Sequence, residues 1–239
     1  MNLKLTLGLA LISSLVGLAH ARVVRSRASS APMNLSVETA QLRNDDDNGR
    51  YMAEIAHLDS RAEKFLARHS CGRQLALVVD IDATAPANWP EMAAEDLGHF
   101  PDAPCSAVRG RPNSPYGALA WGRREKAAAI RPALALLHFA QAHGVTVLFI
   151  TGRHAAERVV TTENLIKAGY GGWNPKNLLM ESNGMHVSSA TDFKAPERTG
   201  IEEKRGYTIA VNAGDQWSDL AGGNSQGEFK RPIPFYHIA

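Results

Sequence analysis

The chain has 239 residues, of which 44% are hydrophobic, 21% charged and 7% aromatic. This composition excludes collagen-like, coiled-coil and wholly disordered proteins, and the length suits a single domain with a substantial core. The net charge of +2 at pH 7 is too small to indicate a nucleic-acid polymer as the partner. With only two cysteines, Cys71 and Cys105, the sequence also excludes a disulfide-stapled scaffold and a Cys-rich zinc module.

The N-terminal segment has the pattern of a secretory signal peptide. Lys4 supplies a positive charge, Leu5 to Leu18 form an apolar run, and Ala19-His20-Ala21 matches the small-x-small cleavage pattern. The apolar run is shorter than the roughly 20 residues that a membrane span needs. We therefore expect residues 1–21 to be removed, leaving a mature chain that starts at Arg22. Its location would be periplasmic or secreted, without a membrane anchor.

Export would change what the two cysteines can do. In an oxidising compartment Cys71 and Cys105 could form a disulfide that closes a loop of about 35 residues, worth roughly 4 kcal/mol in the chain-entropy model. Two free thiols fit the sequence equally well. Both alternatives stay open, because the sequence does not give the distance between the two side chains.

The segment after the signal peptide differs in composition from the rest of the chain. Residues 22–49 mix Arg, Ser, Ala and Asn and predict a poorly ordered arm. The acidic run at its end, Asp45 to Asp47, lacks the ligand spacing of a calcium loop and predicts a solvated turn. The folded domain is expected over residues 50–239. It begins with an amphipathic helix over 51–69, whose apolar side chains recur every three or four residues.

Strand and helix patterns then alternate along the chain. The predicted strands are short apolar runs, at 75–79, 145–150, 178–180 and 208–211. The predicted helices lie between them, at 132–144, 155–168 and 195–205. Such alternation predicts an α/β fold, a parallel sheet with helices on both faces. A long irregular segment rich in Pro, Gly and Asn, 85–122, follows the first strand.

Ligands of parallel sheets bind beyond the carboxyl ends of the strands, where this chain carries polar side chains. Asp80 and Asp82 follow the first strand and share a face of an extended chain, and such a carboxylate pair suits a hard cation such as Mg²⁺. Thr151-Gly152-Arg153 follows the second strand and offers a hydroxyl and amides to an anion. The last predicted strand adds a cation before it and two carboxylates after it: Lys194, Asp215 and Asp219. Each residue alone fits an ordinary turn cap or surface charge, but together they predict a site.

In this order the motifs resemble those of the haloacid dehalogenase superfamily of phosphatases. The set comprises Asp80-x-Asp82-x-Thr84, Thr151-Gly152-Arg153, Lys194 and Gly214-Asp215-x-x-x-Asp219. The flanking sequence is similar to that of the exported acid phosphatases related to plant vegetative storage proteins. The similar segments are Asn88-Trp89-Pro90, Thr162-x-Asn164-Leu165 and the closing Pro234-Phe235-Tyr236. The resemblance covers about residues 50–239, and the ordered set is far more specific than a lone pair of aspartates.

The resemblance implies a three-layer α/β/α Rossmann-like fold with residues 85–122 as a small cap. It implies that Asp80 attacks phosphorus to form an aspartyl-phosphate, while Asp82, a carboxyl with a raised pKa, serves as the acid and base. The groups implied to hold the transferring oxygens are Thr151 and Lys194. The implied ligands of Mg²⁺ are Asp80, the main-chain carbonyl of Asp82 and Asp215, with Asp219 in support.

The substrate implied is a small-molecule phosphomonoester, and two other functions stay open. A phosphotransferase would pass the phosphoryl group to an alcohol in place of water. A storage or binding protein would have lost the nucleophile, and the aspartate at position 80 opposes that alternative. The oligomeric state cannot be inferred from the sequence.

Several residues near the motifs have two interpretations. Ala83 stands where the family commonly has Glu, which predicts altered local packing or substrate preference. Arg153 fits either a supporting place behind the reacting groups or a surface position at a helix start. In the cap, Asn88, Trp89 and Tyr116 are placed to meet a leaving group, and Trp89 fits a packing anchor equally well.

Overall fold

The computed structural model describes residues 34–69, 74–98, 100, 117–185 and 187–237. The signal peptide, both cysteines and Tyr116 lie outside these residues, so the predictions about them stay predictions. None of the helices within the described ranges combines the length and the apolar character that crossing a membrane requires.

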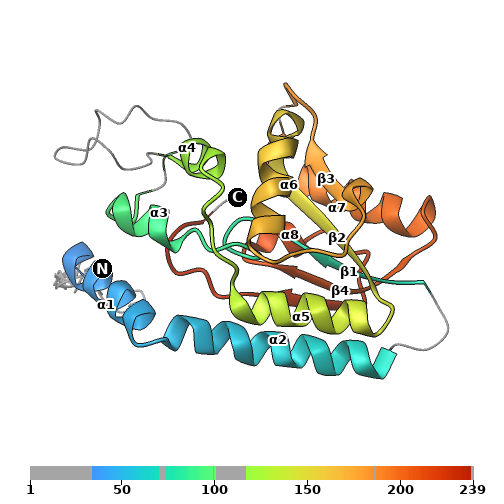
Figure 1. Cartoon of the computed structure of the whole chain (residues 1–239), viewed down its shortest axis with the longest axis horizontal. Coiled ribbons are helices and arrows are strands. Elements are labelled where there is room, and N and C mark those ends of the chain that lie inside the picture. Colours follow the sequence, from blue (N-terminus) through green and yellow to red (C-terminus); the bar gives the residue numbers. More distant parts are fainter. Residues whose placement is uncertain (1–33, 70–73, 99, 101–116, 186, 238–239) are drawn as a thin grey trace, which may run out of the picture. The chain divides into compact units, whose positions relative to one another are not determined.

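A five-stranded sheet forms the centre of the fold, and all of its neighbouring strands are parallel (Figure 1). The strand order is β3-β2-β1-β4-β5. The strands are β1 (Leu75–Val79), β2 (Thr146–His154), β3 (Leu178–Glu181), β4 (Thr208–Gly214) and β5 (Gly227–Lys230). The four predicted strands are confirmed. The sequence did not predict β5, a short edge strand in which Phe229 is the only large apolar side chain.

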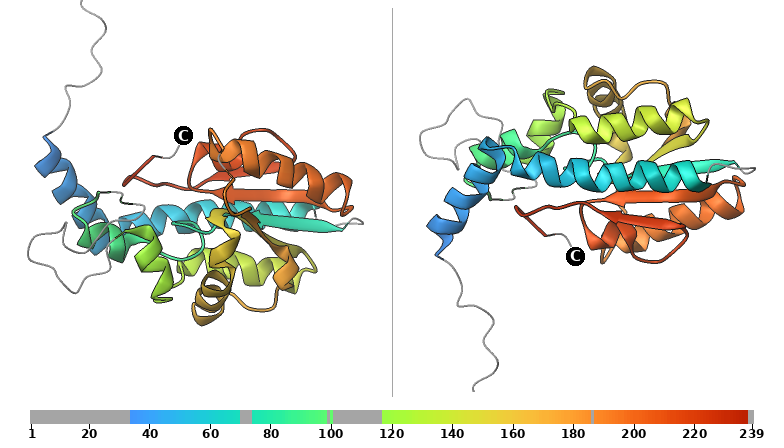
Figure 2. Two further views of the ribbon diagram at one scale, coloured as in Figure 1. Left: turned by 90° about the horizontal axis from the view of Figure 1, so that it is seen from above. Right: turned by 90° about the horizontal axis from the view of Figure 1, so that it is seen from below.

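Helices pack on both faces of this sheet, which confirms the three-layer α/β/α architecture (Figures 1 and 2). The helices over the core are α2 (Arg50–His69), α5 (Arg131–Ala142), α6 (Arg158–Lys167), α7 (Ala190–Glu203) and α8 (Trp217–Leu220). The other helical elements are α1 (Leu35–Asp47), α3 (Trp89–Ala94), α4 (Ala118–Arg123) and the 3₁₀ turns η2 (Ala155–Glu157) and η3 (Pro175–Asn177).

The side chains of β1 alternate between two hydrophobic cores. Leu77 and Val79 belong to the core that α2 and α5 share, whereas Val78 packs in the second core with Phe193 and Ile201 of α7. Every residue of β1 is buried, as expected for a central strand covered on both faces. This burial fixes the carboxyl end of β1, and with it the place of Asp80, in the middle of the sheet edge.

The prediction of a poorly ordered arm is wrong for residues 35–47, which form helix α1. The middle of this helix contains good helix formers, among them Glu38, Gln41 and Arg43. The composition of residues 22–49 as a whole hides them, because the residues before the helix are rich in Ser and Arg. The acidic run therefore closes a helix, and the turn comes after it at Gly49, which has a positive φ of 76°. Arg43 donates to the main-chain oxygen of Ala93, which ties α1 to the cap.

Helix α7 begins five residues earlier than the sequence predicted. Ser189 and Asp192 form a capping box at its start, so Lys194 lies inside the helix and not in the loop before it. Pro196, the second residue of the helix predicted over 195–205, lies in the helix interior, where it removes one main-chain hydrogen bond.

A buried ion pair joins α2 to the end of β5. Asp59 and Arg231 are 2% and 1% exposed. The guanidinium donates to both carboxylate oxygens, at 3.0 and 2.9 Å. Arg231 also donates to the main-chain oxygen of Thr84, whose hydroxyl donates to Asp215 at 2.9 Å. The pair therefore supports the loop after β1.

Replacing Asp59 by Ala is expected to lower the free energy of unfolding by about 3–5 kcal/mol, because Arg231 would be left as a buried charge without a partner. Urea denaturation followed by circular dichroism measures this change. Glu54→Ala is the control, since Glu54 is exposed on the same helix, and it should stay within roughly 0.5 kcal/mol of wild type. Equal stabilities of the two variants would contradict the role given to the pair.

Candidate active site at the carboxyl edge of the sheet

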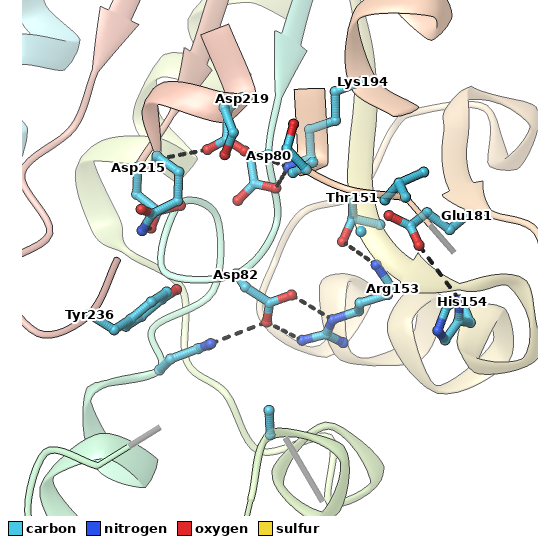
Figure 3. A pocket seen from close by; sticks show the side chains of 18 of the residues that line it. Asp80, Asp82, Thr151, Arg153, His154, Glu181, Lys194, Asp215, Asp219 and Tyr236 are labelled. Atoms are coloured by element: carbon cyan, nitrogen blue, oxygen red, sulfur yellow. Dashed lines mark hydrogen bonds and ion pairs between the residues drawn. The ribbon is translucent and has the colours of Figure 1, made fainter. Parts of the chain in front are cut away.

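The carboxyl ends of β1, β2 and β4 open into one cavity of about 620 Å³ (Figure 3). Six residues that the sequence singled out line it: Asp80, Asp82, Thr151, Lys194, Asp215 and Asp219. They come from positions up to 139 residues apart, and the parallel sheet brings them together. The structure thus gathers all of the predicted site residues, while their roles stay proposals.

Lys194 is buried between two carboxylates. Its Nζ lies 2.5 Å from Oδ1 of Asp80 and 2.6 Å from Oδ1 of Asp219. Burial alone would lower the pKa of Lys194, but the charges of Asp80 and Asp219 raise it above its ordinary value. Lys194 is therefore a cation, placed beside the carboxylate at the end of β1 by the second turn of α7.

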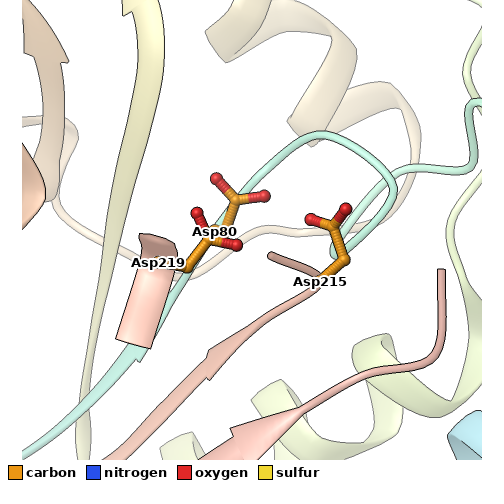
Figure 4. Close-up of side chains that lie close together, drawn as sticks. All are labelled: Asp80, Asp215 and Asp219. Carbon is orange, nitrogen blue, oxygen red and sulfur yellow. The ribbon is translucent and has the colours of Figure 1, made fainter. Parts of the chain in front are cut away.

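Three buried carboxylates meet next to this lysine (Figure 4). Asp80, Asp215 and Asp219 each offer an oxygen, and these oxygens lie within 4.8 Å of one another. Burial and the neighbouring carboxylates raise the pKa of Asp80, although the charge of Lys194 opposes this rise. Burial and Asp219 raise the pKa of Asp215 to about 6. Such repulsion among three carboxylates, of which Lys194 contacts two, fits a hard divalent ion that takes carboxylate ligands.

Local hydrogen bonds hold two of these carboxylates in place. Asp215 accepts from Thr84 at 2.9 Å and from the Gln216 side chain at 2.7 Å. Asp219 accepts from the main-chain nitrogen of Gln216 at 2.8 Å, as part of the cap of α8. Gly214 is required here by close approach, since a Cβ at this position would lie 2.4 Å from the Cβ of Asp219.

Asp82 binds a different partner and stands outside the carboxylate cluster. Arg153 donates to its two oxygens at 2.9 and 2.6 Å, and Asn88 donates to it at 3.1 Å. Burial alone would raise the pKa of Asp82, but Arg153 and the Asn88 hydrogen bond lower it below its ordinary value. The expectation of a raised pKa is therefore wrong for this state of the site. The sequence did not reveal the pairing because the two residues are 71 positions apart.

The loop after β1 also differs from the predicted extended chain. Strand β1 ends at Val79, and residues 82–84 form a turn in which Ala83 has a φ of 53°. A residue with a side chain rarely adopts this left-handed conformation. The buried methyl group of Ala83 therefore lies at a strained position. Asp80 reaches the cavity from the end of β1 and Asp82 from the turn, so the two do not share the face of one extended strand.

Arg153 is part of the site and not a surface residue. Its side chain is only 10% exposed, and it donates to the Thr161 hydroxyl as well as to Asp82. It lies on β2, which continues past the predicted end at residue 150. Thr151, also on β2, is buried, and its Oγ1 accepts from the main-chain nitrogen of Arg153 at 3.2 Å.

The cap contributes a wall of the cavity from α3 and α4. Asn88 lines the cavity, as expected, but Trp89 does not. Its ring packs against Phe235, with centroids 4.7 Å apart, which favours the interpretation as a packing anchor. Five other lining residues with titratable side chains were not assigned to the site from the sequence: Glu91, His154, Glu157, Glu181 and Tyr236. Of these, His154 and Glu181 lie close to the predicted ends of their strands, which was a usable signal.

The fold and this sheet edge define a class of α/β proteins that handle phosphoryl groups with carboxylates. Residues 18–239 match the family model described as "HAD superfamily, subfamily IIIB (Acid phosphatase)". The chain therefore belongs to subfamily IIIB of the haloacid dehalogenase superfamily, the acid phosphatase subfamily.

Individual relatives match shorter segments. Acid phosphatase 1 of Solanum lycopersicum is 37% identical over 119 residues, which cover 49% of this chain and 46% of that protein. Vegetative storage protein 1 of Arabidopsis thaliana is 34% identical over 95 residues, covering 40% of this chain and 34% of that protein. The aligned segment spans less than half the length of these relatives.

A solved structure shows the same fold over most of the chain. The class C acid phosphatase from Bacillus anthracis with tungstate bound has a TM-score of 0.62 and an identity of 17%. The similarity covers 84% of this chain and 86% of that one.

Proposed function

We propose that this chain is an exported, Mg²⁺-dependent acid phosphatase that hydrolyses small phosphomonoesters through an aspartyl-phosphate on Asp80. The observation that carries the proposal is the position of Asp80. Its carboxylate follows the central strand, faces the cavity and contacts the buried cation Lys194. The membership of an acid phosphatase subfamily supports the reaction class.

In the proposed reaction Asp80 uses a carboxylate oxygen to attack phosphorus, and the bond to the leaving oxygen breaks. Lys194 offsets the charge of the transferring oxygens, and the Thr151 hydroxyl at the same edge donates to one of them. Water then attacks the aspartyl-phosphate and releases phosphate, which regenerates the carboxylate.

Asp82 is the proposed proton carrier for both steps. Its pairing with Arg153 favours the carboxylate, the form that takes a proton from the attacking water. In the first step Asp82 must instead carry a proton, which it gives to the leaving oxygen. The ion pair must therefore open when substrate binds, with Arg153 turning toward the new negative charge.

A divalent cation fits the carboxylate cluster, and we assign Asp80, Asp215 and Asp219 as its side-chain ligands. The main-chain oxygen of Asp82 is the further ligand that the family resemblance implies. When bound, the ion would neutralise the charge of the phosphate that the carboxylate must approach.

The mature protein is expected to hydrolyse phosphomonoesters, and EDTA is expected to abolish the activity, because three carboxylates converge where the phosphate must lie. The assay uses a panel of phosphomonoesters and nucleotides after exhaustive chelation, with Mg²⁺ then restored. Restored activity is the expected result. Full activity without any added divalent ion would contradict the metal assignment.

Two alternatives are tested in the same panel. The similarity to vegetative storage proteins favours a non-catalytic protein. A storage role, however, does not require a buried contact between Asp80 and Lys194 at the cavity. Adding alcohol acceptors separates hydrolysis from phosphotransfer, because a transferase would make a new phosphate ester at the expense of free phosphate.

Export rests on the N-terminal sequence alone: a charged start, an apolar run and a cleavage pattern that ends at Ala21. We therefore propose a periplasmic or secreted enzyme. N-terminal sequencing of the protein recovered from its native compartment tests this, and Arg22 is the expected first residue.

A further inference from the structure

A buried glutamate without a hydrogen-bond partner lines the cap side of the cavity. Glu91, in α3, is 1% exposed. Its Oε1 has no partner among the residues that the structure describes, although the side chain borders the same cavity as Asp80. A buried carboxyl oxygen of this kind is costly to leave unsatisfied, so it points to a group that arrives from outside the chain.

The charge of the cavity indicates which kind of group that is. Both strong cations of the lining are already paired, Lys194 with Asp80 and Arg153 with Asp82. The remaining acidic lining residues are Glu91, Glu157 and Glu181. Among the described residues, His154 lies 3.8 Å from Glu181, and the charge of Arg153 also acts on Glu91 and Glu157. Acidic side chains therefore outnumber the cations in the part of the cavity outside the phosphate site.

The surroundings of Glu91 add to this negative character. Glu95, one turn further along the chain, is also buried, and Asp82 approaches from the loop after β1. Burial, Glu95 and Asp82 raise the pKa of Glu91 to about 8, and only Arg153 at the end of β2 opposes the rise. Among the described residues, the cap wall also contains Asn88 and three apolar side chains, Met92, Ala118 and Leu119.

We propose that Glu91 is a specificity-determining residue that binds an ammonium group on the leaving alcohol, so that the preferred substrates are phosphomonoesters of amino alcohols. The apolar cap wall would contact the methylene groups between the ester oxygen and the nitrogen. This inference rests on the proposed phosphatase function and adds the class of its substrate.

The test compares phosphoethanolamine with its uncharged isostere propyl phosphate, in which a methyl group replaces the ammonium group. The two esters have nearly the same shape and use the same reacting groups, so the ratio of their kcat/KM values reports the cationic hydrogen-bond donor alone. At a pH above about 8, where Glu91 is ionised, we expect phosphoethanolamine to be favoured by about ten- to a hundredfold, the value of a buried charge-assisted contact. A ratio near one would overturn the proposal.

The variant Glu91→Gln removes the charge and keeps the shape. It is expected to lower kcat/KM for phosphoethanolamine about ten- to a hundredfold more than for the isostere, whereas Glu163→Gln, at an exposed position on α6, should leave the ratio unchanged. The melting temperature of Glu91→Gln should rise, since an acid buried without a counter-charge is replaced. Equal losses on both substrates with a lower melting temperature would show a structural role and overturn the proposal.

Two further measurements separate this inference from the proposed function. In the wild type the preference for phosphoethanolamine should weaken as the pH falls through about 8, because a protonated Glu91 carries no charge while the ammonium group remains a cation. Calorimetry with ethanolamine and propanol tests the cap even if no phosphate ester is hydrolysed. Binding of ethanolamine in preference to propanol supports the cap site, and equal or absent binding of both contradicts it.

Discussion

Replacing Asp80 by Asn is expected to reduce kcat to below about a hundredth of the wild-type value, because an amide cannot form the covalent intermediate. The fold should persist. The amide has the same shape, its oxygen can still accept from Lys194, and Asp219 remains as the charged partner of that lysine. Steady-state kinetics on a phosphomonoester and a thermal melt measure the two parts of this prediction.

The control for this variant is Asp47→Asn, at an exposed position at the end of α1. It should keep both the activity and the melting temperature of wild type. Trapping adds a direct test, since acid quenching during turnover should leave phosphate bound to the wild type and none to Asp80→Asn. Turnover above about a hundredth of wild type in Asp80→Asn would show that Asp80 is not the nucleophile.

The sequence predicted the architecture because the central strands are covered on both faces. Burial of both faces makes a strand a continuous apolar run, and the runs at 75–79 and 145–150 stand out clearly. Strand β5 gave no such signal. It pairs only with β4, at the edge of the sheet, and its main-chain hydrogen bonds need no particular side chains.

The predicted start of α7 is five residues too late because two local signals compete. Pro196 is typical of a first helical turn, but the capping box of Ser189 and Asp192 sets the true start. The hydrogen bonds of a capping box form at the first turn, whereas a proline inside the helix costs one bond that the packing of Phe193 and Ile201 offsets.

The members of the site were predictable, but their pairings were not. Strand ends bring Asp80, Thr151 and Asp215 together in any parallel sheet. Which carboxylate meets which cation depends on side-chain directions after the strands end. Arg153 therefore pairs with Asp82 and inverts the expected pKa shift, although nothing in the local sequence of either residue indicates it.

The sequence did not indicate Glu91 as a residue of the cavity, for a related reason. A glutamate in a short polar segment predicts a solvated surface, and only the closure of the cap over the sheet edge buries it. Buried acids in insertions between core elements thus become visible only once the tertiary structure is known.

Replacing Lys194 by Ala is expected to lower kcat/KM by roughly two to three orders of magnitude, as for other preorganised groups that stabilise developing charge. The expectation depends on the Nζ contacts with Asp80 and Asp219, which put the only lysine of the described cavity lining beside the proposed nucleophile.

Lys204 provides the matched control, since it lies at the exposed C-terminal end of the same helix. Lys204→Ala should remain near wild type in kcat/KM and in melting temperature. Lys194→Ala leaves Asp80 and Asp219 without their shared cation, so part of its loss could come from unfolding. Lys194→Met refills the volume but also lacks the charge, so thermal melts of both variants separate the two effects, and both should show the kinetic loss when assayed well below their melting temperatures. If the kcat/KM of either folded variant matched wild type, or if Lys204→Ala were the impaired variant, Lys194 would not be the phosphate-binding cation.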